Sequence, residues 1–131
     1  MTANLREAEA LLERVEPWKG TAPAGYHANF LGTMTAVLFM AHWCPREQLE
    51  VALAAPREVG TTRPRVTDGE MYFETCNVVR SVLDARDRYV MVELGGGYAA
   101  RAVDCAVALR KLKPATRPFF VILEALPTYV D

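Results

Sequence analysis

The residues whose types and spacing could do chemistry lie together in the C-terminal half of the chain. A short apolar run ends at Glu93, and three glycines and a helical pattern follow it at once. Gly95, Gly97 and Ala100 have the spacing G-x-G-x-x-A, which is typical of the first turn of a nucleotide-binding βαβ unit. The first glycine permits the tight turn, the second lets a ligand approach the backbone, and the small third residue lets the helix pack closely. Free N–H groups at the helix start attract an anionic group.

Acidic residues flank this turn. Glu124 closes the next apolar run, where it is placed to accept hydrogen bonds from ribose hydroxyls. Glu93 distinguishes between cofactors, because dinucleotide-binding turns usually carry an apolar residue two positions before the first glycine. An acidic residue there, in the pattern E-x-G-x-G, is typical of S-adenosylmethionine methyltransferases, whose cofactor carries a charged amino group. A glycine turn that binds nothing stays the alternative.

The elements that must position these residues follow from hydrophobic periodicity. Thr67 to Glu70 fits a capping box that opens a helix. A strand at Tyr89–Glu93, a helix at Ala99–Leu112 and a strand at Phe119–Leu123 follow. We expect the two strands to be adjacent and parallel, joined by a right-handed crossover. The continuous apolar run of the first strand favours burial on both faces.

Side-chain patterns predict which faces of the two helices are buried. The first helix should bury the stripe that contains Tyr72, Cys76, Val79 and Leu83. On the second helix only one side is mainly polar, and it contains Arg101, Asp104, Ala108 and Lys111.

The first half of the chain is expected to be helical and irregular. A helix is predicted from Leu5 to Val15, behind a cap formed by Asn4 and Glu7. The most apolar stretch, Phe30 to Cys44, is too short to span a membrane and is interpreted as a buried strand or core segment. The other segments are a loop-like 19–29, a strand or a helix over 33–40, a short helix over 45–54, and a polar connector over 57–65.

Length and composition limit the functions that are possible. The 131 residues allow one domain at most, with 51% hydrophobic and 24% charged residues. We divide them into an N-terminal helical or irregular segment, 1–66, and a partial Rossmann-like cofactor-binding unit, 67–131. A net charge of -1 gives no electrostatic footprint for nucleic acid or an anionic membrane. Three widely spaced cysteines and no secretory signal indicate reduced thiols in a cytoplasmic protein.

Other residues with chemical potential have simpler interpretations. His42 and Cys44 lack further ligands for a metal site, and burial in an apolar segment explains them better, so no metal is expected. His27 is interpreted as a surface histidine in a loop. Cys76 and Cys105 are assigned to the core. Arg101 follows the turn and is interpreted as a solvated helix residue, with a carboxylate contact as the alternative.

Three segments carry a family resemblance. Arg88 to Tyr98 (RYVMVELGGGY) and Phe119 to Thr128 (FFVILEALPT) resemble the first motifs of FkbM-like S-adenosylmethionine-dependent methyltransferases, and Asp68 to Glu74 (DGEMYFE) resembles the helix start that precedes them. The resemblance covers about residues 65–131. It implies an α/β fold: an N-terminal helical segment followed by the first βαβ unit of a Rossmann-like methyltransferase, truncated after its second strand.

The resemblance also implies roles for individual residues. Glu93, Gly95 and Gly97 would line the methionine side of S-adenosylmethionine, and Glu124 would hold the ribose. The implied reaction is methyl transfer, to an oxygen of a small molecule or sugar, while the catalytic base stays unknown. One departure is Ala99, where many methyltransferase loops carry another glycine. A nicotinamide-dependent oxidoreductase fragment and a fragment that binds no cofactor are the alternatives.

The early end of the sequence leads to an expectation about behaviour. Later strands would carry the adenine contacts and most substrate contacts, so the 131-residue chain alone should lack methyltransferase activity. An open apolar strand edge should favour self-association.

Overall fold

The computed structural model describes residues 3–42 and 44–125, which form two compact units. Unit 1 contains the described parts of 1–15 and 64–131, and unit 2 contains those of 16–63. The division therefore differs from the predicted one at residue 66, because the first helix belongs with the C-terminal part. The side chain of Asn4, predicted to cap that helix, and residues 126–128 of the family resemblance lie outside the described residues.

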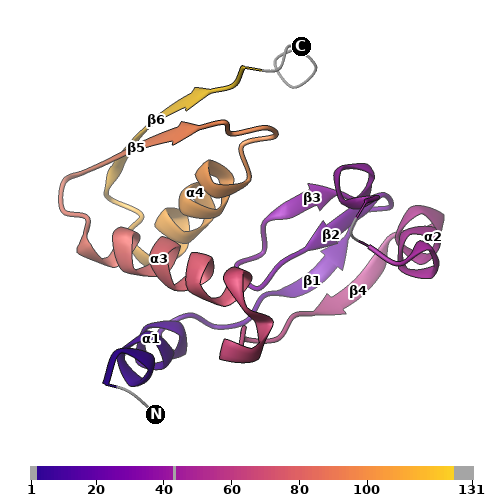
Figure 1. Cartoon of the computed structure of the whole chain (residues 1–131), viewed down its shortest axis with the longest axis horizontal. Coiled ribbons are helices and arrows are strands. Elements are labelled where there is room, and N and C mark those ends of the chain that lie inside the picture. The colour runs from indigo at the N-terminus through magenta and orange to yellow at the C-terminus, as the bar shows by residue number, and fades with distance from the viewer. Residues whose placement is uncertain (1–2, 43, 126–131) are drawn as a thin grey trace. The chain divides into compact units, whose positions relative to one another are not determined.

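Unit 1 contains the predicted strand–helix–strand order, preceded in the sequence by two α-helices and a short 3-10 helix (Figure 1). Its strands pair in parallel, with Val90 opposite Phe119 and Leu94 opposite Leu123, which confirms the predicted pairing. The elements are α1 (Ala3–Glu13), η2 (Val66–Asp68), α3 (Glu70–Asp84), β5 (Arg88–Leu94), α4 (Ala100–Leu112) and β6 (Arg117–Leu123).

Helix α1 packs on α3 because its apolar stripe needs a partner. Leu12 and Val15 are buried, and the Cys76 thiol on α3 lies 3.9 Å from the carbonyl oxygen of Ala8. An ion pair of 3.2 Å between Arg80 and Glu7 also links the two helices. Burial of this apolar stripe against α3 is the physical reason why α1 belongs to unit 1.

Two details of the α3 and α4 predictions are wrong. The Asp68 carboxylate accepts the Arg65 N–H at 2.8 Å and so caps η2, whereas α3 begins after Gly69 without a side-chain cap. On α4, Asp104 is only 5% exposed and Ala108 is also buried, so the side expected to be polar is buried at its middle, whereas Lys111 on the same side is exposed. The predicted stripe on α3 is confirmed at Tyr72, Cys76 and Val79, with Val78 and Val82 buried beside it.

Helix α4 lies against the β5–β6 sheet, and the opposite sheet face is open (Figure 1). Val90, Val92 and Leu94 are 61%, 57% and 74% exposed, whereas Tyr89 is buried. The prediction that this strand is covered on both faces is therefore wrong for the described residues. Its apolar run has one buried side, because α4 covers only one face of the sheet.

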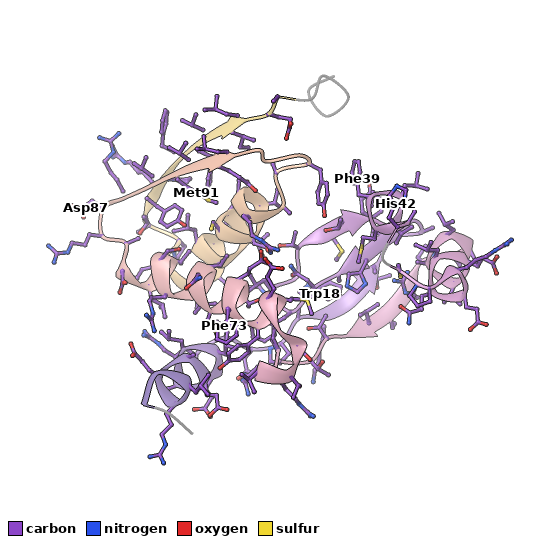
Figure 2. The ribbon with its side chains drawn as sticks, in the orientation of Figure 1. Trp18, Phe39, His42, Phe73, Asp87 and Met91 are labelled. Atoms are coloured by element: carbon purple, nitrogen blue, oxygen red, sulfur yellow. The ribbon has the colours of Figure 1, made fainter. Side chains whose placement is uncertain are left out.

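Unit 2 is built from short antiparallel pairs. Strands pair β1 with β4 and β2 with β3. The ring of the partly buried Trp18, labelled in Figure 2, lies against Gly32. The elements are β1 (Lys19–Ala22), β2 (Tyr26–Ala28), β3 (Met34–Ala36), η1 (Val37–Met40), α2 (Arg46–Ala54) and β4 (Arg57–Gly60).

Several predictions for unit 2 need correction. The loop-like 19–29 contains β1 and β2, and the polar connector 57–65 contains β4. These strands form because partners elsewhere in the sequence complete their hydrogen bonds: β1 pairs with β4, and β2 pairs with β3. Residues 33–40 hold both a strand and a 3-10 helix, whereas the helix over 45–54 is confirmed as α2. The segment Phe30 to Cys44 is buried in its first part only, since Leu38 and Phe39 are exposed.

Candidate functional site

The glycine turn connects β5 to α4 through three residues with positive φ. Gly95, Gly97 and Ala99 have φ of 66°, 51° and 60°. The N–H groups of Gly95 and Gly96 both donate to the carbonyl oxygen of Leu123, at 2.7 and 3.3 Å. The turn is thereby tied to the carboxyl end of β6, which is where ligands bind in α/β sheets.

Glu93 caps helix α4 from the end of the neighbouring strand. Its Oε1 accepts the N–H of Arg101 at 3.3 Å, and its Oε2 accepts the N–H of Ala102 at 3.0 Å. The first N–H groups of a helix have no partner within the helix, and a negative charge there is favourable. Because Ala99 offers no side-chain cap, Glu93 supplies the acceptors for N–H groups in the first turn of α4.

Glu124 closes the site from the second strand. Its Oε2 accepts the N–H of Gly97 at 2.6 Å, across 27 residues of sequence. The structure therefore brings the four sequence-predicted residues, Glu93, Gly95, Gly97 and Glu124, to one edge of the sheet. It also gives both carboxylates backbone N–H partners that the sequence did not indicate.

Gly96 is the residue of this turn that sequence reasoning missed. A Cβ atom there would lie 2.7 Å from Cγ2 of Ile122 and 3.3 Å from Cγ of Glu93, whereas Gly95 and Gly97 have nothing within 4 Å of such an atom. Gly96 is thus required by packing, and the two flanking glycines border open space that a ligand can enter. The only sequence feature that could have indicated the role of Gly96 is the unbroken run of three glycines.

Ala99 is the turn residue whose backbone conformation would suit glycine better. Its φ of 60° and ψ of 34° lie in the left-handed region, and no other described residue besides glycine has positive φ. A Cβ atom in this conformation costs roughly 1–2 kcal/mol, so glycine would be the less strained residue. The local strain lies directly beside the predicted cofactor turn.

Arg101 is not simply a solvated residue, so that interpretation is wrong. Its guanidinium pairs with the carboxylate of Glu74 on α3, and it donates to Asp104 at 3.0 Å. The pairing explains why Asp104 can be buried, because a buried carboxylate needs a cation or hydrogen-bond donors. Arg101 therefore joins α3 to the first turn of α4, beside the site.

A small polar cluster lies under the sheet. The Tyr89 hydroxyl is 2.9 Å from Oγ of Ser81 and donates to the Cys105 thiol at 3.1 Å. Burial, followed by the hydrogen bond to Cys105, raises the pKa of Tyr89 to about 12. Burial also raises the pKa of the Cys105 thiol above its usual 9.0. The assignment of Cys76 and Cys105 to the core is confirmed, and this low thiol acidity makes Cys105 a poor nucleophile.

The remaining singled-out residues lie in unit 2. His27 belongs to strand β2 and not to a loop. His42 is exposed, so its predicted burial is wrong, and Figure 2 shows it with Phe39 where η1 ends. The Cys44 thiol lies 3.4 Å from Oε1 of Gln48. Within residues 3–42 and 44–125, no three His, Cys, Asp or Glu side chains are grouped to hold a metal ion.

Comparisons with known proteins add no relative. No family model, curated protein or solved structure matches the chain. Every helix in the described part of the chain is too short or too polar to pass through a bilayer. The functional argument therefore depends on the geometry of the turn and on the chemistry of its residues.

Proposed function

We propose that unit 1 is the S-adenosylmethionine-binding part of a methyltransferase that acts on a small molecule or sugar in the cytoplasm. The observation that carries the proposal is the parallel β5–α4–β6 unit, with Glu93 and Glu124 at the carboxyl ends of its strands. Between them, Gly95 and Gly97 leave open the space that a side chain would fill. These residues fit a cofactor with a charged amino group and ribose hydroxyls.

Each residue has a role in this proposal. Gly95 and Gly97 let the methionine part approach the backbone, and Glu93 holds α4 in place while its negative charge favours the ammonium group. Glu124 accepts ribose hydroxyls with lone pairs beyond the one that binds Gly97, since an ionised carboxylate has about four acceptor positions. The cofactor supplies an activated methyl group on a sulfonium, so the protein contributes mainly positioning and exclusion of water.

Titration calorimetry with S-adenosylmethionine tests the proposal on the protein and on Glu124→Ala. We expect the variant to bind roughly 10- to 150-fold more weakly, the scale of a hydrogen bond to a charged group. Gly97→Val should weaken binding at least as much, because its side chain enters the open space. Glu70→Ala, an exposed change on α3, is the matched control and should bind normally. Unchanged affinity in both site variants would reject the assignment.

A second candidate is a βαβ unit that binds no cofactor. The specific observation in its favour is that Glu93 and Glu124 already accept the N–H groups that an anionic ligand would use. Thermal unfolding separates the two candidates. If neither S-adenosylmethionine nor a nicotinamide dinucleotide raises the midpoint, while Glu124→Ala lowers it, the carboxylates serve the fold alone. A shift with the nicotinamide cofactor only would favour an oxidoreductase.

A further inference from the structure

Unit 2 contains a cavity that the proposed function does not use. Its volume is about 400 Å³, within the range of roughly 300–1,000 Å³ that is usual for small-molecule sites. The wall comes from β2, η1, α2 and β4, all of them in unit 2. His27, Glu47 and Arg57 are among the residues that line it.

Arg57 is the residue that gives this cavity a chemical preference. Its Nη1 atom is fully buried and has no hydrogen-bond partner among the described residues. A buried guanidinium N–H without an acceptor is costly, and buried polar groups in proteins are nearly always paired. A ligand with a negatively charged oxygen would remove this cost. A carboxylate suits best, because its two oxygens match the planar fork of a guanidinium.

The charges around Arg57 favour a ligand with one negative charge over a ligand with two. Partial burial and, second, the charge of Arg57 lower the pKa of His27 below its usual 6.5, so the imidazole is neutral at pH 7 and adds a donor but no charge. Glu47 in the wall contributes a carboxylate of its own. One cation opposite one anion gives little attraction for a phosphate dianion.

The rest of the wall indicates what the ligand carries besides its charge. Val37 and Ala52 are buried, and Met40 and Val51 complete an apolar surface from η1 and α2. Cavities of this kind bind a ligand by burying its apolar body, while a few polar groups fix its orientation. We propose that the cavity of unit 2 binds a small monocarboxylic acid with an aliphatic body, held by Arg57.

The direct test is calorimetry on the whole protein with 4-methylpentanoate as the probe. We expect saturable binding of one molecule, and at least about tenfold weaker binding by Arg57→Met, the size of one charge-assisted hydrogen bond. The matched control is Arg46→Met, which removes an exposed arginine of α2 outside the cavity and should bind normally. The uncharged amide, 4-methylpentanamide, should bind as weakly to the natural protein as the acid binds to Arg57→Met.

A second variant keeps the test decisive if Arg57→Met does not fold. Val51 is 64% exposed, so Val51→Glu should preserve the fold while it places a negative charge in the wall. It should also weaken the probe at least about tenfold by repulsion and crowding. Inorganic phosphate that binds as tightly as the acid, equal binding of acid and amide, or no binding of the acid at millimolar concentration would each overturn the proposal.

Discussion

At the scale of single residues, Gly96 is the position of the turn where a side chain has the least room. Gly96→Ala should destabilise the protein by about 1–3 kcal/mol, the usual cost of overpacking, because its methyl group meets Ile122 and Glu93. Chemical denaturation measures the change. The same substitution in an Ile122→Ala background should cost less, since Cγ2 of Ile122 is the nearest obstacle. An equal cost in both backgrounds would show that the contact is not the cause.

The raised pKa of Tyr89 predicts how the stability of the folded protein changes with pH. The folded protein holds the phenol proton up to about pH 12, whereas the unfolded chain releases it near 10.0. The unfolded state therefore binds fewer protons between these values, and stability falls as pH rises through this window. Urea unfolding from pH 8 to pH 12 should show the fall, with a smaller slope above pH 10 for Tyr89→Phe. Parallel slopes for the two proteins would contradict this assignment.

At the scale of elements, Arg101 joins α3 to α4 beside the turn. Arg101→Met should cost about 1–2 kcal/mol, because it leaves the buried Asp104 carboxylate without this cation, while partial exposure limits the loss. The matched control is Arg80→Met, which breaks the more exposed pair between α3 and α1 and should cost less than about 1 kcal/mol.

A double variant tests whether Arg101 and Asp104 stabilise each other. Asp104→Asn should recover part of the loss in the Arg101→Met background, since the amide no longer needs a cation. The measurement is the unfolding free energy of the single and double variants. Additive losses would mean that the two side chains do not stabilise each other.

At the scale of the whole molecule, the open face of the β5–β6 sheet should control self-association. Val90, Val92 and Leu94 are exposed in register with Phe119 and Leu123, so one continuous apolar face is uncovered among the described residues. Such faces and unpaired strand edges favour pairing with another chain. Light scattering after gel filtration should show oligomers that dissociate in the double variant Val90→Lys, Val92→Lys. Val66→Lys, outside the sheet, should leave them intact, and a monomeric natural protein would refute the idea.

The sequence was enough to predict the unit that carries the candidate site. Strand β5, helix α4 and strand β6 have strong local signals, because an apolar run, a glycine turn and a helical period depend only on neighbouring residues. Parallel pairing then brings Glu93 and Glu124 to the same edge of the sheet. The positions of the predicted site residues could therefore be inferred without coordinates.

Only the tertiary structure decided how those residues are used and how the first half folds. Strands β1 and β4 are short and mostly polar, and each exists because the other, over 30 residues away in sequence, completes its hydrogen bonds. The burial of Asp104, the burial of Nη1 of Arg57 and the close contact at Gly96 likewise depend on segments that are distant in the sequence. Hydrophobic periodicity in the sequence indicates which residues are buried. It does not indicate which distant segment packs against a buried polar group, because that depends on the tertiary structure.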